Sequence, residues 1–284
     1  MSPRSLPSLS EFQHSGQFVD FRGHRIFVRD AGHGPPLLCL HGFPTSSYDF
    51  ARIVPELVAH RRVVLFDFLG FGFSDKPQHH PYSLFEQADI AQAVAKELSL
   101  GKLTLLAHDM GSSVALELLR RSTPEIERLV LLNGSVFLRH YRPLLSQRLL
   151  LHKQVGPLLT RLGLINRRVF HAQFAKLFPD RPSDEELDLF WQLIVHNGGQ
   201  RNYHLLIRYL DERHQHELTW LDALTAHRAP LTVIWGQRDP VSVPAIAKEV
   251  LLRRPDATYV PLYDIGHYPQ WEDPQTVARI VLGL

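Results

Sequence analysis

The sequence predicts an α/β protein with a mostly parallel sheet, helices on both of its faces and a helical block inserted between two strands. Short, continuous apolar runs recur along the chain, and amphipathic helical patterns separate them. Such runs are typical of strands that are buried on both faces. Alternation of strands with helices is typical of a parallel sheet. The expected buried strands are residues 35–40, 62–67, 103–107, 129–132, 231–235 and 258–262.

Other segments complete this core. Residues 17–30 predict a strand pair around the turn Arg22-Gly23-His24. A helix is expected at 83–98, because Ser83 and Glu86 have the spacing of a capping box. Two more helices are expected at 110–121 and 273–282.

One long stretch breaks the alternation. Residues 137–222 carry no strand pattern and predict several helices, at 144–151, 168–178, 184–196 and 202–213. A helical block between two sheet strands suits a cap over the strand C-termini, where open α/β sheets bind ligands. We therefore expect a core of residues 1–136 and 223–284, interrupted by a cap of residues 137–222.

Composition narrows the function classes. Of 284 residues, 31 are Lys or Arg and 29 are Asp or Glu, so the net charge of +2 predicts no nucleic-acid partner. The single cysteine, Cys39, excludes a disulfide framework and a cysteine-rich metal site. No apolar run is long enough for a membrane span, and the first residues lack the apolar core of a secretory signal. These features predict a cytoplasmic protein without an integral membrane segment.

Two segments could suggest a cofactor or a metal, but neither pattern is complete. Residues 67–75 resemble a dinucleotide-binding loop that lacks its third glycine, because Asp75 stands in that place. Residues 214–217 read His-Gln-His-Glu, with no further ligands at a matching spacing. We therefore expect neither cofactor nor metal.

The most informative segment is Ala107-His-Asp109-Met-Gly-Ser112, which follows a buried strand and opens a helix. Small residues are needed around such a sharp turn, whose usual nucleophile is Ser in G-x-S-x-G. Here Asp109 occupies that place. A carboxylate can attack a carbon that bears a leaving group and form an ester with it. The alternatives are that Asp109 only caps the helix or that Ser112 or Ser113 is the nucleophile of a shifted turn.

Two further residues suit a hydrolytic partnership with Asp109. Asp239 and His267 each follow a buried strand, in the chain order nucleophile, acid, histidine. His267 could take a proton from water while Asp239 orients the imidazole. The other possible acid position, after strand 129–132, holds Asn133 and no carboxylate.

The loop His41-Gly42-Phe43-Pro44 follows the first buried strand. In this arrangement we expect the backbone N–H groups of Phe43 and Met110 to stabilise an oxyanion. His41 and Pro44 are expected to line the substrate site.

Together these motifs resemble the α/β-hydrolase fold over residues 17–284, and within it the aspartate-nucleophile branch of epoxide hydrolases and haloalkane dehalogenases. Longer runs, including HGFPTSSYD at 41–49, DFLGFGFSDKP at 67–77 and HYPQWEDP at 267–274, are similar to a vertebrate member of the fold.

The resemblance implies further site residues. Epoxide hydrolases protonate the epoxide oxygen with cap tyrosines, which implies this role for Tyr209, with Tyr141 or Tyr203 as its partner. Haloalkane dehalogenases commonly place Trp after the nucleophile and Asn after His-Gly, where this chain has Met110 and Phe43. Trp191 of the cap could replace the missing indole as a substrate-binding group.

The resemblance therefore favours a cofactor-independent epoxide hydrolase that acts on a small, apolar, electrophilic substrate with water. A dehalogenase and a ligand-binding or scaffold protein are the alternatives. The oligomeric state is not predicted.

Overall fold

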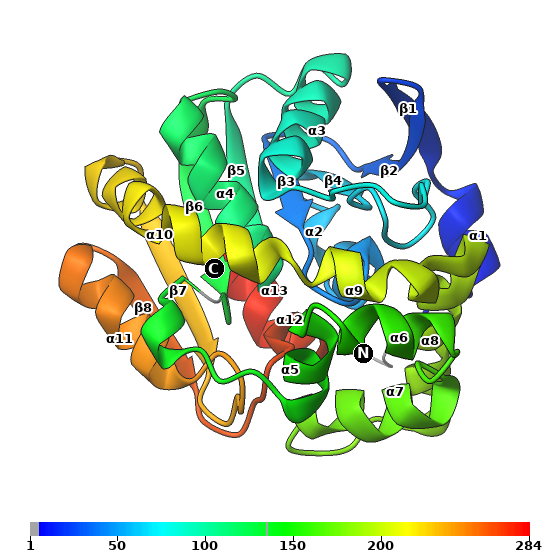
Figure 1. Ribbon diagram of the computed structural model, residues 1–284. Coiled ribbons are helices and arrows are strands. Elements are labelled where there is room, and N and C mark those ends of the chain that lie inside the picture. The colour runs from blue at the N-terminus through cyan, green and yellow to red at the C-terminus, as the bar shows by residue number, and fades with distance from the viewer. Residues whose placement is uncertain (1–5, 135) are drawn as a thin grey trace.

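The structure is a computed structural model that describes residues 6–134 and 136–284, and it confirms the predicted fold class (Figure 1). Its sheet has eight strands in the order β1-β2-β4-β3-β5-β6-β7-β8. The pairings of β1 with β2 and of β2 with β4 are antiparallel, and the remaining pairings are parallel. The strands are β1 (Gln17–Phe21), β2 (His24–Ala31), β3 (Pro36–Leu40), β4 (Arg62–Phe66), β5 (Leu103–His108), β6 (Ile126–Leu132), β7 (Leu231–Gly236) and β8 (Thr258–Leu262).

The described helices around the sheet include the three predicted at 83–98, 110–121 and 273–282, together with four that were not predicted. They are α1 (Leu9–His14), α2 (Val54–Leu57), α3 (Leu84–Glu97), α4 (Met110–Arg121), α11 (Pro244–Arg253), α12 (Pro269–Glu272) and α13 (Pro274–Leu282). The predicted capping box at the start of α3 is wrong. Ser83 accepts a hydrogen bond from the Phe85 N–H, whereas the Glu86 carboxylate contacts His80 at 2.6 Å.

A helical block lies between β6 and β7. It contains α5 (Leu145–Leu151), α6 (Val155–Arg161), α7 (Arg167–Phe174), α8 (Asp184–Val195), α9 (Tyr203–Leu206) and α10 (Tyr209–Ala226). The block also contains the short 3-10 helices η2 (Leu138–His140), η3 (Ala175–Leu177) and η4 (His196–Asn202), and a further one, η1 (Ser47–Phe50), follows β3. The predicted helix at 202–213 is wrong, because the chain breaks between α9 and α10 and then continues as helix to Ala226. Helix α6 was not predicted.

Packing places α10 alongside α4, the helix that follows Asp109 (Figure 1). Trp220 of α10 donates a hydrogen bond of 2.9 Å from its indole N–H to Glu117 of α4. Phe43, in the loop after β3, packs against Tyr203 and Tyr209 of the helical block, so the block lies beside the end of β3. Across the described residues, no helix has the length and apolar character needed to span a membrane.

Candidate active site

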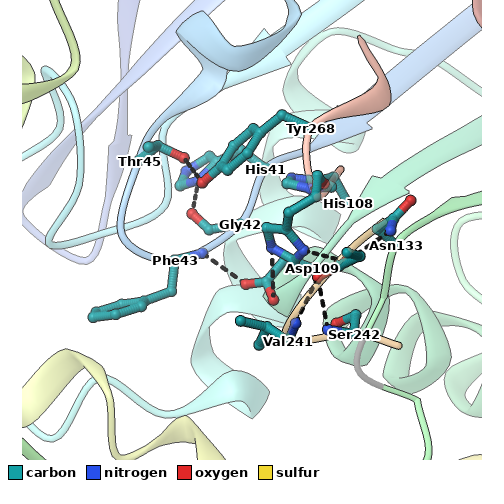
Figure 2. A network of polar contacts seen from close by, with 12 residues as sticks. His41, Gly42, Phe43, Thr45, His108, Asp109, Asn133, Val241, Ser242 and Tyr268 are labelled. Carbon is teal, nitrogen blue, oxygen red and sulfur yellow. Dashed lines mark hydrogen bonds and ion pairs between the residues drawn. The ribbon is translucent and has the colours of Figure 1, made fainter. Parts of the chain in front are cut away.

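Asp109 occupies a sharp turn between β5 and α4. Its φ of 48° lies in the left-handed region that favours glycine, at a cost of about 1–3 kcal/mol for other residues. Its side chain makes no capping hydrogen bond to α4, which contradicts the helix-cap alternative. The strained backbone instead directs the carboxylate towards the loop after β3 (Figure 2).

That loop binds one carboxylate oxygen. The Phe43 N–H donates a hydrogen bond of 3.0 Å to Asp109 Oδ1. The N–H groups of Phe43 and Met110 both favour the ionised form of the carboxyl and lower its pKa. Gly42 is required here, because a Cβ at this position would lie 2.6 Å from the Cβ of Asp109. Both predicted oxyanion donors therefore lie against the Asp109 carboxyl group, and Phe43 binds its Oδ1.

His267 lies on the other side of the carboxylate. Its Nε2 is 3.6 Å from Asp109 Oδ2, and its Nδ1 is 2.6 Å from Asp239 Oδ2. All three side chains are buried. The structure thus brings the predicted nucleophile, histidine and acid together, in that order in space.

The Asp239 carboxylate is fully engaged. Its Oδ1 accepts hydrogen bonds from the N–H groups of Val241 and Ser242, at 2.7 and 3.0 Å. Its Oδ2 accepts one from the Asn133 amide at 2.7 Å in addition to the one from His267. These four donors fix the orientation of the carboxylate.

Asn133 was missed as a site residue. Its amide oxygen accepts a hydrogen bond from the Gly236 N–H while its amide N–H₂ holds Asp239. The sequence analysis treated this position only as a place where a carboxylate could stand. Its location directly after a buried strand was the available signal.

Burial and charge set the protonation of the site. Burial lowers the pKa of His267, but the carboxylates of Asp239 and Asp109 outweigh this effect and raise it to about 9. Burial raises the pKa of Asp109, and the neighbouring imidazolium partly offsets that rise. Near neutral pH the site therefore holds a carboxylate and an imidazolium that stabilise each other.

His108 contacts the backbone of His267. Its Nε2 lies 2.8 Å from the His267 carbonyl oxygen and donates to it. Burial lowers the pKa of His108 well below its ordinary value, so the ring is neutral. This contact fixes the loop on which the candidate base stands.

His41 does not have the predicted substrate-binding role. It is completely buried and accepts a hydrogen bond of 3.0 Å at Nε2 from the Phe68 N–H. Its Nδ1 lies 2.9 Å from the Gly42 carbonyl oxygen and donates to it. Burial lowers its pKa to about 3, which keeps the ring neutral. His41 therefore shapes the oxyanion loop and has no free polar atom for a ligand.

A cavity of about 390 Å³ runs through the cap towards this loop. Phe43, Pro44 and Tyr203 line it, together with a wall rich in Leu, Ile and Phe. Pro44 and Tyr203 thus have positions that suit the predicted contact with substrate. Trp191 does not line this cavity among the described residues; it packs behind the wall, with its ring 5.6 Å from that of Phe170.

The cavity does not reach Asp109, which is absent from its described lining. The Phe43 ring stands between them, 5.5 Å from the Tyr203 ring and 6.0 Å from the Tyr209 ring. We call these three side chains the aromatic wall.

Two cap tyrosines approach Asp109. Tyr141 pairs with Ser242 through an isolated β-bridge, which places it beside the loop that carries Asp239. Tyr209 begins α10 and packs on Phe43. Burial raises the pKa of both phenols, and the charge of Asp109 raises it further. The buried hydroxyls of Tyr141, Tyr203 and Tyr209 have no hydrogen-bond partner among residues 6–134 and 136–284.

Arg213 is the second site residue that sequence reasoning missed. It is one helical turn beyond Tyr209 on α10, and only 2% of it is exposed. Its guanidinium lies 6.0 Å from the centre of the Tyr141 ring, and its Nη1 has no hydrogen-bond partner in the described part of the chain. Its charge lowers the pKa of Asp109 and of both tyrosines. Arg213 thus places a buried positive charge close to the candidate nucleophile.

Within the described ranges, no three His, Cys, Asp or Glu side chains are grouped as metal ligands would be. The polar side chains nearest Asp109 are those of His267, Tyr141, Tyr209 and Arg213.

Comparisons with known proteins agree with this architecture. The putative hydrolase LipZ of Mycobacterium tuberculosis is 40% identical over 288 residues, which cover 98% of each chain. The human mesoderm-specific transcript homolog protein, which the runs at 41–49, 67–77 and 267–274 resemble, is 39% identical over 299 residues, covering 99% of this chain and 89% of the relative.

Among solved structures, haloalkane dehalogenase DbeA from Bradyrhizobium elkani superposes with a TM-score of 0.82 at 24% identity, over 95% of this chain and 96% of that one. This likeness shows the shared fold. Residues 35–274 match the family described as alpha/beta hydrolase fold, and the chain belongs to that family as a hydrolase of this fold.

Proposed function

We propose that this protein is a cofactor-independent epoxide hydrolase with Asp109 as its nucleophile. The observation that carries the proposal is the pair of buried phenol hydroxyls, of Tyr141 and Tyr209, near the Asp109 carboxylate. The two phenols are close enough to affect each other's pKa, but neither hydroxyl makes a hydrogen bond of normal geometry to the described residues. An epoxide needs such a donor, because its ring oxygen becomes an alkoxide as the carbon–oxygen bond breaks. A buried hydroxyl without a partner would gain a hydrogen bond to that oxygen.

In the first step, Asp109 Oδ2 attacks an epoxide carbon and the ring carbon–oxygen bond breaks. A phenol proton passes to the ring oxygen, which leaves a hydroxyalkyl ester on Asp109 and a tyrosinate. Arg213 stabilises the negative charge that develops on this side of the site. Asp109 Oδ1 remains against the N–H groups of Phe43 and Met110.

In the second step, His267 acts as base. Esterification removes the charge of Asp109, one of the influences that raise the pKa of His267. The imidazolium then gives its proton to the tyrosinate and becomes neutral. Water attacks the ester carbonyl as its proton passes to Nε2, and the Phe43 and Met110 N–H groups bind the oxyanion. Collapse releases the diol with the proton from His267, and the regenerated carboxyl group returns a proton to the imidazole.

The cap, proposed as residues 137–222, supplies substrate specificity. Its cavity wall is almost entirely apolar, which favours an apolar epoxide. The buried Cys39 suits a reducing compartment, and we propose the cytoplasm as the location.

One observation favours a second candidate, dehalogenation through the same ester. The unpartnered Arg213 Nη1 could bind a departing halide. Met110 and Phe43, however, replace the Trp and Asn that commonly hold halide in haloalkane dehalogenases. Epoxide opening accounts for both the tyrosines and the arginine.

The test is the intact mass of a His267→Gln variant after incubation with epoxides and haloalkanes. Without its base the enzyme should retain the ester, so an added mass equal to the whole epoxide is expected. An added mass equal to that of the haloalkane minus hydrogen halide would instead establish dehalogenation. A His267→Gln/Asp109→Asn variant is the matched control and should gain no mass. If the folded single variant gains no mass from either panel, the proposal is wrong.

A further inference from the structure

The outer part of the cap exposes apolar side chains at unusual density. Eleven large hydrophobic residues are exposed in the described structure, and six of them lie between residues 145 and 169. They are Leu145, Leu149, Leu158, Leu162, Leu164 and Val169. We call the exposed surface of α5, α6 and α7 that these residues form the cap face.

Helical geometry organises these side chains. Leu145 and Leu149 are four residues apart on α5, and Leu158 and Leu162 have the same spacing along α6 and its C-cap. Residues at this spacing lie on one side of a helix. Each helix therefore presents an apolar stripe to solvent. Single scattered leucines on a surface would need no explanation, but a stripe of them does.

The charged side chains of the same segment are all positive. Residues 137–179 contain eight Lys or Arg and no Asp or Glu, although the whole chain is nearly balanced. Arg139 and Arg167 make ion pairs with Glu249 and Asp188. The others have no ion-pair partner in the described residues: Arg142, Arg148, Lys153, Arg161, Arg168 and Lys176.

The apolar cavity opens on this face. Leu149, Leu164 and Val169 are exposed and also line the cavity, so they form its rim. Its wall continues inward from this rim to Phe43 and Tyr203. An apolar compound that dissolves in a bilayer could enter here without crossing water.

We propose that the cap face docks on the surface of an anionic lipid bilayer. Leucines would enter the boundary between headgroups and acyl chains, and the surrounding Lys and Arg would meet anionic headgroups. A second copy of this chain fits the face less well, because a two-fold interface would oppose its unpaired cations to one another.

Vesicle co-sedimentation tests the proposal directly, with no dependence on catalysis. The protein is mixed with vesicles of phosphatidylcholine alone or with about 30% phosphatidylserine, at low and high salt. We expect clear binding to the anionic vesicles, weak binding to the neutral ones and a marked loss at high salt.

Two variants separate the contributions to binding. Leu158→Ser/Leu162→Ser should weaken the partition coefficient about tenfold by removing exposed apolar area. Arg148→Gln/Lys153→Gln/Arg161→Gln should weaken it about a hundredfold on anionic vesicles, since each cation contributes about 1 kcal/mol, roughly fivefold. All five side chains are exposed, so the fold should not change.

Matched controls lie elsewhere on the surface. Leu252→Ser removes a leucine from α11 that is more exposed than Leu158 or Leu162, and Lys96→Gln/Lys102→Gln/Lys248→Gln removes three cations outside the cap. Both controls should bind as the wild type does. Absence of vesicle binding would overturn the proposal, as would equal losses in the controls. A dimer in light scattering that dissociates only in the leucine variant, with no vesicle binding, would assign the face to self-association instead.

Discussion

Replacing Asp109 by Asn should lower the pKa of His267 substantially. The wild-type pKa of about 9 depends partly on the Asp109 charge, whose Oδ2 lies 3.6 Å from Nε2. At that distance two unit charges interact by ~1 kcal/mol in a water-like environment and by ~5 kcal/mol at an effective dielectric constant of ~20. With 1.36 kcal/mol per pKa unit, the expected decrease is about 1–3 units.

Nuclear magnetic resonance of the imidazole nitrogens across pH measures this change directly. The matched control is Asp264→Asn, which removes an exposed carboxylate three residues before His267 and should leave its titration unchanged. An unchanged His267 pKa in Asp109→Asn would refute the electrostatic coupling on which the proposed second step depends.

The same coupling affects stability. The folded-state pKa of His267 is raised above its ordinary 6.5, so the resulting stabilisation is complete below about pH 6.5 and is lost as pH rises through about 9. The difference corresponds to about 3 kcal/mol. Urea unfolding at pH 6 and pH 10 should therefore show a smaller loss of stability in Asp109→Asn than in the wild type.

Five other substitutions, at four positions, give distinct expectations. Tyr209→Phe and Tyr141→Phe should each slow ester formation about 10²–10⁴-fold from epoxides, measured as single-turnover mass gain, with little effect on ester hydrolysis; equal slowing of both steps would contradict a proton-donor role. Arg213→Met should slow ester formation at least about tenfold, measured as single-turnover mass gain, whereas Arg213→Lys should restore part of the rate; a wild-type rate in Arg213→Met would argue against the electrostatic role. Gly42→Ala should abolish turnover and destabilise the fold by about 1–3 kcal/mol in thermal unfolding, because the added methyl meets the Asp109 side chain at 2.6 Å; a fully active variant would show that the loop can move away.

Local sequence patterns predicted the parts of this site that depend on turns. The strand-turn-helix pattern around Asp109 and the strand ends before Asp239 and His267 fix backbone positions locally. These positions converge because parallel strands end at one edge of the sheet. The roles of the three residues remain predictions until the trapping experiment is done.

Residues whose surroundings come from cap packing were harder to predict. Arg213 lies in a charged helical segment, and because Arg is rarely buried, such a segment is expected to be exposed to solvent. In the structure, α10 packs on α4 and Arg213 is buried. The prediction for Trp191 was wrong for the converse reason. An aromatic residue in the cap is expected to line the cavity, and the sequence does not show that Trp191 packs against Phe170 instead. His41 was misassigned because the sequence does not show that both ring nitrogens bond to backbone.

The aromatic wall has a consequence for turnover. Because Phe43 and Tyr203 line the inner part of the cavity and Asp109 does not, passage between the cavity and Asp109 depends on motion of these side chains. A diol formed beside Asp109 must pass them and then carry two hydroxyl groups through an apolar passage that offers them few hydrogen-bond partners. For reactive substrates we expect release of the diol, and not bond breaking, to limit the turnover rate. The turnover rate should then respond more to solvent viscosity and to truncation of the Phe43 side chain than to the leaving group.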